Sequence, residues 1–330
     1  MALRTKKVGD RFLTVFLVAA ACTLFLAACA STGNSPSPPA SIDLIEASGI
    51  AVRGGGKAAV IGGDESPGRL WGVALDDFAQ RWELPYPAGT PPVDDVEALC
   101  PWGGNQLFVI CSQSKTQPRQ KVKPERGRLA LLTLGQDARR ILAAAVHDGL
   151  RDELLAHLAA SGRDLIENPV ALSEGTPVNG GLNVEGLAAW KGQLLVGLRS
   201  PAGRGGAIVV PIRSPEQLFS PLAPSARPDF GKPMILPAAA GEGIRDLAAD
   251  GDSVLALLGP SGEANHPKPR IVRWNPATGE TRAITVKGLD ELLKPEGIAL
   301  DPQGRLLVAQ DLRPPITEPA LLRLEMESTP

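Results

Sequence analysis

The sequence contains few of the residues on which most enzyme chemistry depends. Its 330 residues include 3 histidines, 4 cysteines and 1 tyrosine. No two histidines have the spacing of a zinc site. No G-x-S-x-G elbow, H-E-x-x-H motif or glycine-rich phosphate loop occurs either. These absences argue against the common zinc-dependent, serine-hydrolase and nucleotide-binding classes, and they leave the catalytic residues of any enzyme activity unknown.

An excess of one charge is also missing. The 34 Lys and Arg residues almost balance the 36 Asp and Glu residues, so the formal net charge is −2. A near-neutral chain has no electrostatic signature of nucleic-acid binding, and we expect no nucleic-acid partner. Aromatic residues make up only 4% of the chain, which is low for a protein built of strands. Glycine and proline are abundant instead, with 36 and 31 residues, which suits short strands joined by many turns.

The N-terminal segment has the pattern of a signal peptide. Basic residues come first, and an almost entirely apolar run follows from Phe12 to Ala28. The run leads into Cys29 through the residues Leu-Ala-Ala, and this ending resembles the lipobox of bacterial lipoproteins. The resemblance implies cleavage before Cys29. It also implies that lipid, including palmitate, is attached to the sulfur of Cys29 and to the new amino group. The alternative is a plain transmembrane anchor, although a run of about 17 residues is at the lower limit for a membrane span.

The sequence therefore predicts three parts: a signal peptide (1–28), a lipidated cysteine with a flexible tether (29–40), and a single folded domain (41–330). The tether is rich in Ser, Pro, Gly and Asn and has too few apolar residues to form a core. Ala30 follows the cysteine where an aspartate would signal retention in the inner membrane of many Gram-negative bacteria. By that resemblance we expect a lipid-anchored protein of the cell envelope, in the outer membrane and facing the periplasm.

Two cysteines, Cys100 and Cys111, remain in the predicted domain, in a compartment that permits disulfides. A turn near Gly103 would place Cys100 opposite Leu107 in a hairpin, so Cys111 would lie four residues further along the strand. At about 3.3 Å per residue, this separation exceeds the reach of a disulfide. The hairpin register is inferred, and a disulfide therefore stays open as the alternative.

Self-comparison finds five versions of one stretch, of which the third reads NVEGLAAWKGQLLVGLRS. Each version has two short apolar runs around a turn, the pattern of a β-hairpin. The five versions begin at Glu46, Asp95, Asn183, Gly243 and Lys294. Their third residues are Ser48, Glu97, Glu185, Arg245 and Glu296. The spacings between these residues are 49, 88, 60 and 51, so one unit is about 50 residues long and the longest interval holds an insertion.

Further strand-like runs follow the hairpins. RLWGVAL and QRWELPY follow the first hairpin, and RIVRWNP and TRAITVK follow the fourth. Four strands in about 40 to 50 residues are typical of a propeller blade. The chain is therefore predicted to be an all-β propeller of about five four-stranded blades, with six as the alternative. After the last hairpin only ALLRLEM follows, and SIDLI near Ser41 is the candidate for its missing strand.

The insertion predicts a short helix near residues 148–160. Its leucines at 150, 154, 155 and 158 fall on one helical face. Asp148 is in the position of a helix cap. We interpret this segment as a decoration packed on the rim of the propeller.

The motifs of these repeats resemble a bacterial family known as domain of unknown function 3616. The resemblance is carried by DDVEAL with ICSQS, by LNVEGLAAWKGQLLVGLRSP with GRGGAIVVPI, by GIRDLA with LLGPSG, and by KPEGIAL. It extends over nearly everything from Glu46 to the C-terminus and implies the propeller fold. The second repeat departs from it at Ala98, where a glycine is usual. The family has no agreed activity, so the resemblance implies no mechanism.

The first strand of a propeller blade lines the central channel, and its start lies on the same rim as the end of the second strand. The repeat therefore gathers polar side chains around one channel mouth. The candidate ligand-binding or metal-binding residues are Glu97, Asn183, Glu185, Arg199, Arg245, Asp246, Glu296 and Asp311. Further polar residues at equivalent positions are Glu46, Ser48, Asp64, Asp95, Ser112 and Ser114. The serines among them have no obvious general base.

Three interpretations of this ring remain open. In the first, Glu97, Glu185 and Glu296 hold a hard cation such as calcium, which prefers oxygen ligands. By analogy of fold, the protein would then be a divalent-metal-dependent hydrolase of an ester or phosphoester. In the second, Arg199 and Arg245 pair with the glutamates in a structural network. In the third, the mouth binds a ligand without chemistry.

One feature, a basic loop, tilts the choice slightly toward an anionic ligand. Between Lys115 and Arg128 it carries six Lys and Arg residues against one glutamate, and it should lie on the same rim. The alternative is a solvated loop that faces lipid headgroups or glycan phosphates. The leading functional prediction is an envelope-anchored lipoprotein whose propeller binds a small-molecule or protein ligand at the channel mouth. The metal-dependent hydrolase is the alternative.

Overall fold

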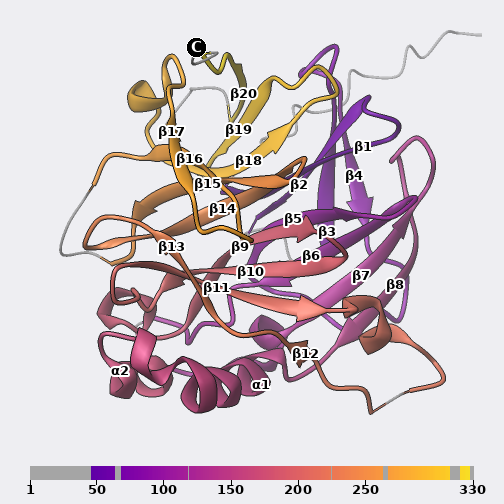
Figure 1. Ribbon diagram of the computed structural model, residues 1–330. Helices are drawn as coiled ribbons and strands as arrows, with labels where there is room; N and C mark the ends of the chain where they lie inside the picture. The colour runs from indigo at the N-terminus through magenta and orange to yellow at the C-terminus, as the bar shows by residue number, and fades with distance from the viewer. Residues whose placement is uncertain are drawn as a thin grey trace, which may run out of the picture. The chain divides into compact units, whose positions relative to one another are not determined.

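Five β-sheets follow one another along the chain, one for each repeat (Figure 1). The computed structural model describes residues 46–63, 68–117, 119–223, 225–262, 267–312 and 320–327. In each sheet the first two strands are the antiparallel hairpin of the repeat. The predicted all-β propeller is confirmed, with five blades.

The first two blades have four strands each, in sequence order from the inside outward. Blade one consists of β1 (Ala47–Arg53), β2 (Ala58–Gly63), β3 (Arg69–Ala74) and β4 (Arg81–Pro85). Blade two consists of β5 (Val96–Trp102), β6 (Gln106–Cys111), β7 (Leu129–Leu134) and β8 (Ile141–His147).

The other three blades vary in their outer strands. Blade three consists of β9 (Asn183–Trp190), β10 (Gln193–Ser200), β11 (Gly206–Arg213), β12 (Asp229–Phe230) and β13 (Met234–Pro237). Both β12 and β13 pair with β11, so they form one outer strand broken in two. Blade four consists of β14 (Glu242–Asp250), β15 (Ser253–Pro260), β16 (Arg270–Trp274) and β17 (Thr281–Ile284). Blade five consists of β18 (Pro295–Leu300), β19 (Leu306–Gln310) and β20 (Leu321–Leu324).

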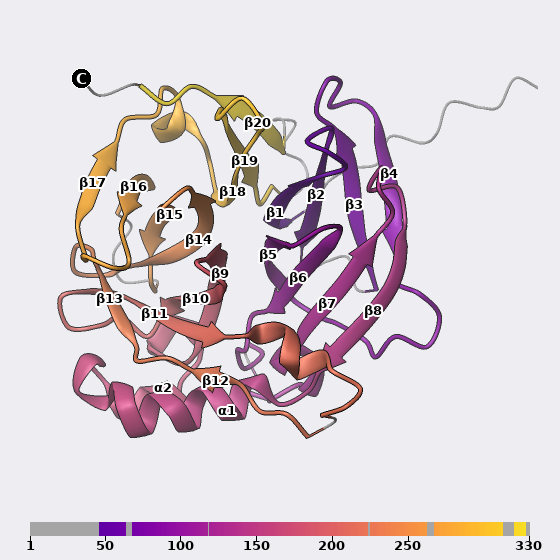
Figure 2. The ribbon, with the colours of Figure 1, turned by 45° about the vertical axis from the view of Figure 1, so that its right-hand side comes forward.

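The blades form a closed ring around the innermost strands (Figure 2). Going round, β1 contacts β5, β5 contacts β9, β9 contacts β14, β14 contacts β18, and β18 returns to β1. The residues after β17 also pair with the C-terminal segment after β20, through a bridge between Val286 and Met326. The predicted fourth strand of blade five, residues 41–45, lies outside the described residues.

Hydrophobic clusters fill all five spaces between neighbouring blades. Both faces of most inner strands are therefore buried, which explains why the apolar runs of the sequence are continuous rather than alternating. Aliphatic side chains make up most of these clusters. Phe108 and Trp274 are the largest fully buried side chains among the described residues, so the core needs few aromatic rings.

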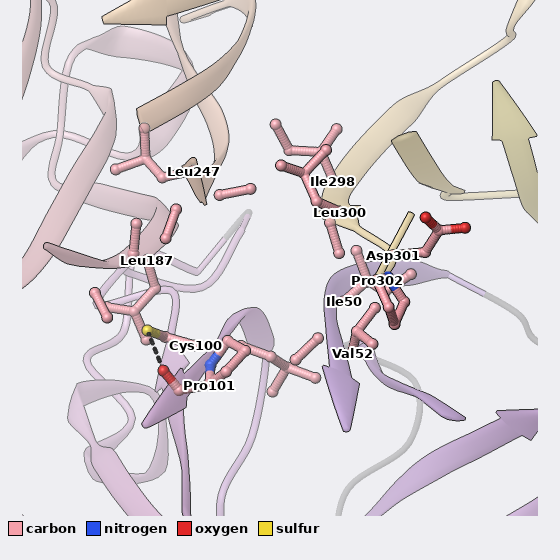
Figure 3. Close-up of a pocket in the computed structure, with 17 residues that line it drawn as sticks. Ile50, Val52, Cys100, Pro101, Leu187, Leu247, Ile298, Leu300, Asp301 and Pro302 are labelled. Atoms are coloured by element: carbon pink, nitrogen blue, oxygen red, sulfur yellow. Dashed lines mark hydrogen bonds between the residues drawn. The ribbon is translucent and has the colours of Figure 1, made fainter. Parts of the chain in front are cut away.

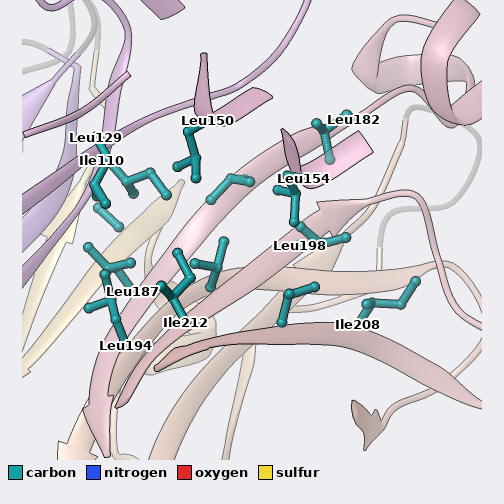
Figure 4. Close-up of a cluster of buried hydrophobic side chains, with 14 of the residues drawn as sticks. Ile110, Leu129, Leu150, Leu154, Leu182, Leu187, Leu194, Leu198, Ile208 and Ile212 are labelled. Carbon is teal, nitrogen blue, oxygen red and sulfur yellow. The ribbon is translucent and has the colours of Figure 1, made fainter. Parts of the chain in front are cut away.

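The helical insertion covers the space between blades two and three. It contains α1 (Leu150–His157) and α2 (Pro169–Glu174). Leu150, Leu154 and Leu158 are fully buried in the same cluster as residues of both blades, and Figure 4 shows the first two beside side chains such as Ile110 and Leu198. The predicted cap was wrong, because Gly149 precedes the helix with φ 84° and no side-chain cap. The carboxylate of Asp148 instead lies 2.5 Å from Arg128 Nε.

Both cysteines of the domain are free and buried. Cys100 lies opposite Phe108, and Cys111 lies opposite Val96 at the other end of the same hairpin. The register differs by one residue from the prediction, yet it keeps the two sulfurs apart as expected. Within the described residues, no helix is long and apolar enough to cross a membrane.

Candidate ligand-binding site at the channel mouth

The inner strand of every blade has an irregularity at the same place. In β5, Val96 pairs with Cys111 and Ala98 with Ile110, so Glu97 is an extra residue without a partner in β6. The same bulge occurs in the other blades, at Ser48 with Gly49, at Glu185, at Arg245 and at Glu296. A bulge turns its extra side chain out of the regular alternation of the strand. The repeat therefore presents one such side chain per blade at the start of the inner strand.

Arg245 is the centre of an ion-pair network that joins three blades. Its Nη1 lies 3.1 Å from Glu185 Oε2 in blade three, and its Nη2 pairs with Glu296 Oε1 in blade five. Arg199, at the end of β10, binds the other oxygen of Glu185 at 2.7 Å. Asn183 Nδ2 also donates to Glu185, at 2.8 Å. The structure thus brings together most of the residues that the repeat placed at the mouth.

Burial and charge act against each other in this network. Burial opposes ionisation of Glu185, but the charges of Arg199 and Arg245 and the hydrogen bonds from Arg199 and Asn183 outweigh it. They hold the pKa of Glu185 below its ordinary value. Burial lowers the pKa of Arg245 to about 10, so this guanidinium remains charged at neutral pH. The charge of Glu97 acts on both arginines, which places its carboxylate at the same mouth.

Lys294 is a member of the network that the sequence analysis missed. Its Nζ pairs with Asp311 Oδ2 and lies 3.6 Å from Glu296 Oε1. The signal for it was present, because Lys294 stands two residues before Glu296, as Asn183 stands two before Glu185. The mouth is therefore held by three cations, Arg199, Arg245 and Lys294, among four carboxylates.

Asp246 does not belong to the mouth, although the sequence analysis placed it there. The residue follows the bulge, is 0% exposed, and directs its carboxylate at the backbone of neighbouring inner strands. It accepts hydrogen bonds from Leu247 N at 2.7 Å and Ile298 N at 2.8 Å, and from the backbone of Leu187. Burial raises the pKa of Asp246 well above its ordinary range, against these hydrogen bonds. It connects blades three, four and five inside the ring.

The second blade contributes a separate polar cluster. Arg126 Nη1 lies 2.7 Å from Asp95 Oδ2, and Ser112 Oγ donates to the same carboxylate. The hydroxyl oxygens of Ser112 and Ser114 are 2.9 Å apart. Both serines are buried. They therefore support the position of Asp95. Asp64, also expected at the mouth, lies outside the described residues.

The basic loop is tied to aspartates rather than open to a ligand. Lys123 lies 3.0 Å from Asp94, and Arg126 lies 3.5 Å from the same carboxylate. Arg128 pairs with Asp148, as described above. Three of the six basic side chains are thus neutralised, so the loop supports an anionic ligand less than its sequence predicted.

The arrangement favours ion pairs over a metal at the mouth. Among the residues that the structure describes, no group of three or more His, Cys, Asp and Glu side chains is placed to hold a metal ion. The guanidinium of Arg245 lies between the carboxylates of Glu185 and Glu296, where the metal interpretation requires the cation. An arginine side chain keeps its charge in proteins and has no acceptor for a metal.

A cavity of about 480 Å³ opens beside this network. Four cationic residues line it, Arg199, Arg245, Lys268 and Lys294, against one carboxylate, Asp290. Arg245 Nη1 is buried and has no hydrogen-bond acceptor in the described part of the chain, because its contact with Glu185 lacks hydrogen-bond geometry. Four cations and one carboxylate thus line the cavity, and three of these cations, Arg199, Arg245 and Lys294, are also paired with carboxylates of the network.

A second cavity, of about 310 Å³, lies in the central channel. Figure 3 shows the side chains around it, among them Ile50, Leu187, Leu247 and Ile298 from four different blades. The lining comes from the later part of each inner strand and is apolar apart from Cys100 and Asp301. The channel is thus charged where the inner strands begin and apolar where they end. The repeat pattern of the sequence pointed only to the charged end.

Replacing Glu185 with glutamine should lower the free energy of unfolding by about 1–3 kcal/mol, because two arginines lose a buried carboxylate. Since the folded-state pKa of Glu185 is below the unfolded value, this stabilisation is present above the unfolded pKa and is lost as the pH falls through the folded one. Urea unfolding of wild type and variant at pH 7 and at pH 3 measures the loss of stability and its dependence on pH. The difference between wild type and variant should therefore shrink in acid.

The metal interpretation predicts the opposite result for the same variant. Crowded carboxylates repel each other without a cation, so the apo variant should keep or gain stability, and calcium should stabilise only the wild type. A melting temperature of the wild type that rises with calcium and falls with chelator would contradict the ion-pair interpretation.

Comparison with known proteins supports the family resemblance. The profile of a family described as "Protein of unknown function (DUF3616)" matches residues 176–294. No curated protein sequence matches the chain. Among solved structures, the glutaminyl cyclase of Myxococcus xanthus is similar, with 15% identity and a TM-score of 0.48, covering 86% of this chain and 91% of that one. A glucose dehydrogenase is similar with 14% identity and a TM-score of 0.43, covering 87% and 97%.

These structural similarities are too distant to carry an activity over to this chain. The family match is narrower than the sequence analysis expected, since it spans blades three and four and ends at Lys294. It includes Asn183, Glu185, Arg199 and Arg245, which are most of the ion-pair network. Residues 176–294 therefore resemble the family described as "Protein of unknown function (DUF3616)".

Proposed function

We propose that the protein binds an anionic small molecule in the cavity beside the channel mouth, and that lipid on Cys29 holds it in the cell envelope. The observation that carries the binding proposal is the cavity of about 480 Å³ with four cationic residues and one carboxylate in its wall. A cavity of this size is within the range of small-molecule sites. Arg199 and Arg245 provide guanidinium groups to this wall.

The ion-pair network supports this proposal by making the site rigid. Arg199 is held by Glu185 and by its hydrogen bond to the carbonyl of Pro260, at 3.1 Å. Lys294 is held by Asp311 and Glu296. Fixed cations bind an anion at a lower entropic cost than mobile ones. The carboxylates of the mouth therefore serve to orient the cations.

Binding of inorganic phosphate, sulfate, acetate and citrate at constant ionic strength tests the proposal. We expect at least one of them to raise the melting temperature of the wild type in a saturable manner. Lys268 lines the cavity and is exposed, so Lys268→Glu should weaken that binding about tenfold without unfolding the protein. Lys287→Glu, at an exposed position that does not line the cavity, is the matched control. No binding by the wild type, or equal weakening in both variants, would contradict the proposal.

The anchoring proposal rests on the lipobox-like ending at Cys29. Two or more acyl chains hold a protein stably at a membrane, whereas one does not. Cys29→Ser should block lipid attachment and leave the precursor uncleaved, which mass spectrometry and detergent partitioning measure. A variant that is still processed and still requires detergent would overturn the lipid anchor.

A further inference from the structure

The cavity beside the mouth has an apolar wall opposite its cations. Leu292 and Leu293 line it, together with four prolines at positions 260, 267, 269 and 295. Proline has no backbone N–H, so this wall offers a ligand carbon surface rather than donors. Resting on the anion-binding function proposed above, we infer that the ligand is an amphipathic anion, a carboxylate on a short alkyl chain.

Leu293 is the residue that points to an alkyl chain. Its neighbour Leu292 packs against the cluster between blades four and five, but Leu293 is 57% exposed. Only six large hydrophobic side chains are exposed among the residues that the structure describes. Leu293 is the one of these six that lines the cationic cavity. An exposed leucine in the wall of a cationic cavity offers a carbon surface to the apolar part of a ligand.

The backbone holds Leu293 in this position. Its N–H donates to Gln310 Oε1 at 3.0 Å, and Gln310 is 0% exposed in β19. The next residue, Lys294, accepts a hydrogen bond at its carbonyl from Asp311 N at 2.9 Å. The segment is therefore fixed to the end of β19, and Leu293 is presented to the cavity rather than left in a loose loop.

The size of the cavity agrees with a ligand larger than an inorganic anion. A water molecule occupies about 30 Å³ in the liquid, and a small oxyanion has the volume of only a few water molecules. Such an anion would therefore leave most of the cavity unfilled. The cationic and apolar walls meet at consecutive residues, because Leu293 adjoins Lys294. A ligand that fills the cavity therefore reaches both a cationic wall and the carbon surface of Leu293.

Calorimetric titration with acetate, butanoate, hexanoate and octanoate, below their micelle concentrations, tests this inference. A methylene buried against carbon contributes about 0.8 kcal/mol, or about fourfold in affinity, and in a half-open cavity we expect about two- to fourfold per methylene. Leu293→Ser should reduce this gain per methylene. Leu222→Ser, at a leucine that is 93% exposed and does not line the cavity, should behave as the wild type.

The outcomes separate this inference from the function on which it rests. If acetate and octanoate bind equally, the anion site stands and the alkyl assignment is wrong. If no anion in either experiment binds, the binding function itself is wrong. A chain-length gain that survives Leu293→Ser would also overturn the inference, because the alkyl chain would then not lie on Leu293.

Discussion

Replacing Asp246 with alanine should lower the free energy of unfolding by about 3–5 kcal/mol, because backbone N–H groups of three blades lose their shared acceptor. Leu247 N and Ile298 N are buried donors, and the backbone of Leu187 bonds to the same carboxyl group. An edge strand that faces a channel has no neighbouring strand to accept its N–H groups, so no backbone acceptor replaces the lost one. Urea unfolding at pH 7 measures the effect.

Two further variants define the cause of this loss. Asp246→Asn keeps the shape and one acceptor oxygen, and since burial already favours the neutral carboxyl it should cost less than alanine. Asp252→Ala removes a carboxylate in the same blade whose side chain is 85% exposed and pairs with Lys191 at 3.3 Å, so it should change stability by less than about 0.5 kcal/mol. If Asp246→Ala costs no more than Asp252→Ala, Asp246 does not hold the blades together.

Gly243→Ala should lower the free energy of unfolding almost as much as Asp246→Ala. Its effect arises at the channel mouth rather than inside the channel. A Cβ at this position would lie 2.0 Å from the carbonyl oxygen of Arg199 and 2.7 Å from its carbonyl carbon. Both atoms are backbone, so blades three and four must move apart. Overpacking of this kind costs about 3 kcal/mol. The movement would also shift Arg199 relative to Arg245, and anion binding should therefore weaken along with stability.

Gly103→Ala is the matched control for this variant. Gly103 lies in the turn between β5 and β6, and a Cβ there would meet no atom within 4 Å. Its stability should therefore remain within about 0.5 kcal/mol of the wild type. Thermal unfolding measures the stability of both variants. Anion titration at a temperature where both are folded then compares their binding. A Gly243→Ala protein as stable as Gly103→Ala would contradict the close approach of the two blades.

Much of the fold could be predicted because each blade repeats the same local sequence pattern. Two apolar runs around a turn make a hairpin wherever they occur, and five copies of this hairpin predict five blades. The bulge residues Glu97, Glu185, Arg245 and Glu296 were also aligned correctly. Their common position depends only on where each strand starts.

The prediction failed where a residue's role depends on a neighbouring blade. Asp246 follows Arg245 directly and appears equally polar in the sequence, but the bulge sends the two side chains to different places. Asp148 looked like a helix cap, but Arg128 pairs with it across 20 residues of chain. The basic loop looked open to an anion, but Asp94 and Asp95 neutralise part of it. Contacts of this kind have no local pattern.

The sequence by itself determined the five-bladed ring and the alignment of charged residues at its mouth, because turns, apolar runs and bulges are encoded within each repeat. Only the tertiary structure decided which charges pair, where Asp246 points and which wall Leu293 lines. Arg245 meets Glu185 and Glu296 at sequence separations of 60 and 51 residues. The distances between those atoms follow from how five blades pack around one axis, and that packing is a property of all the interfaces together.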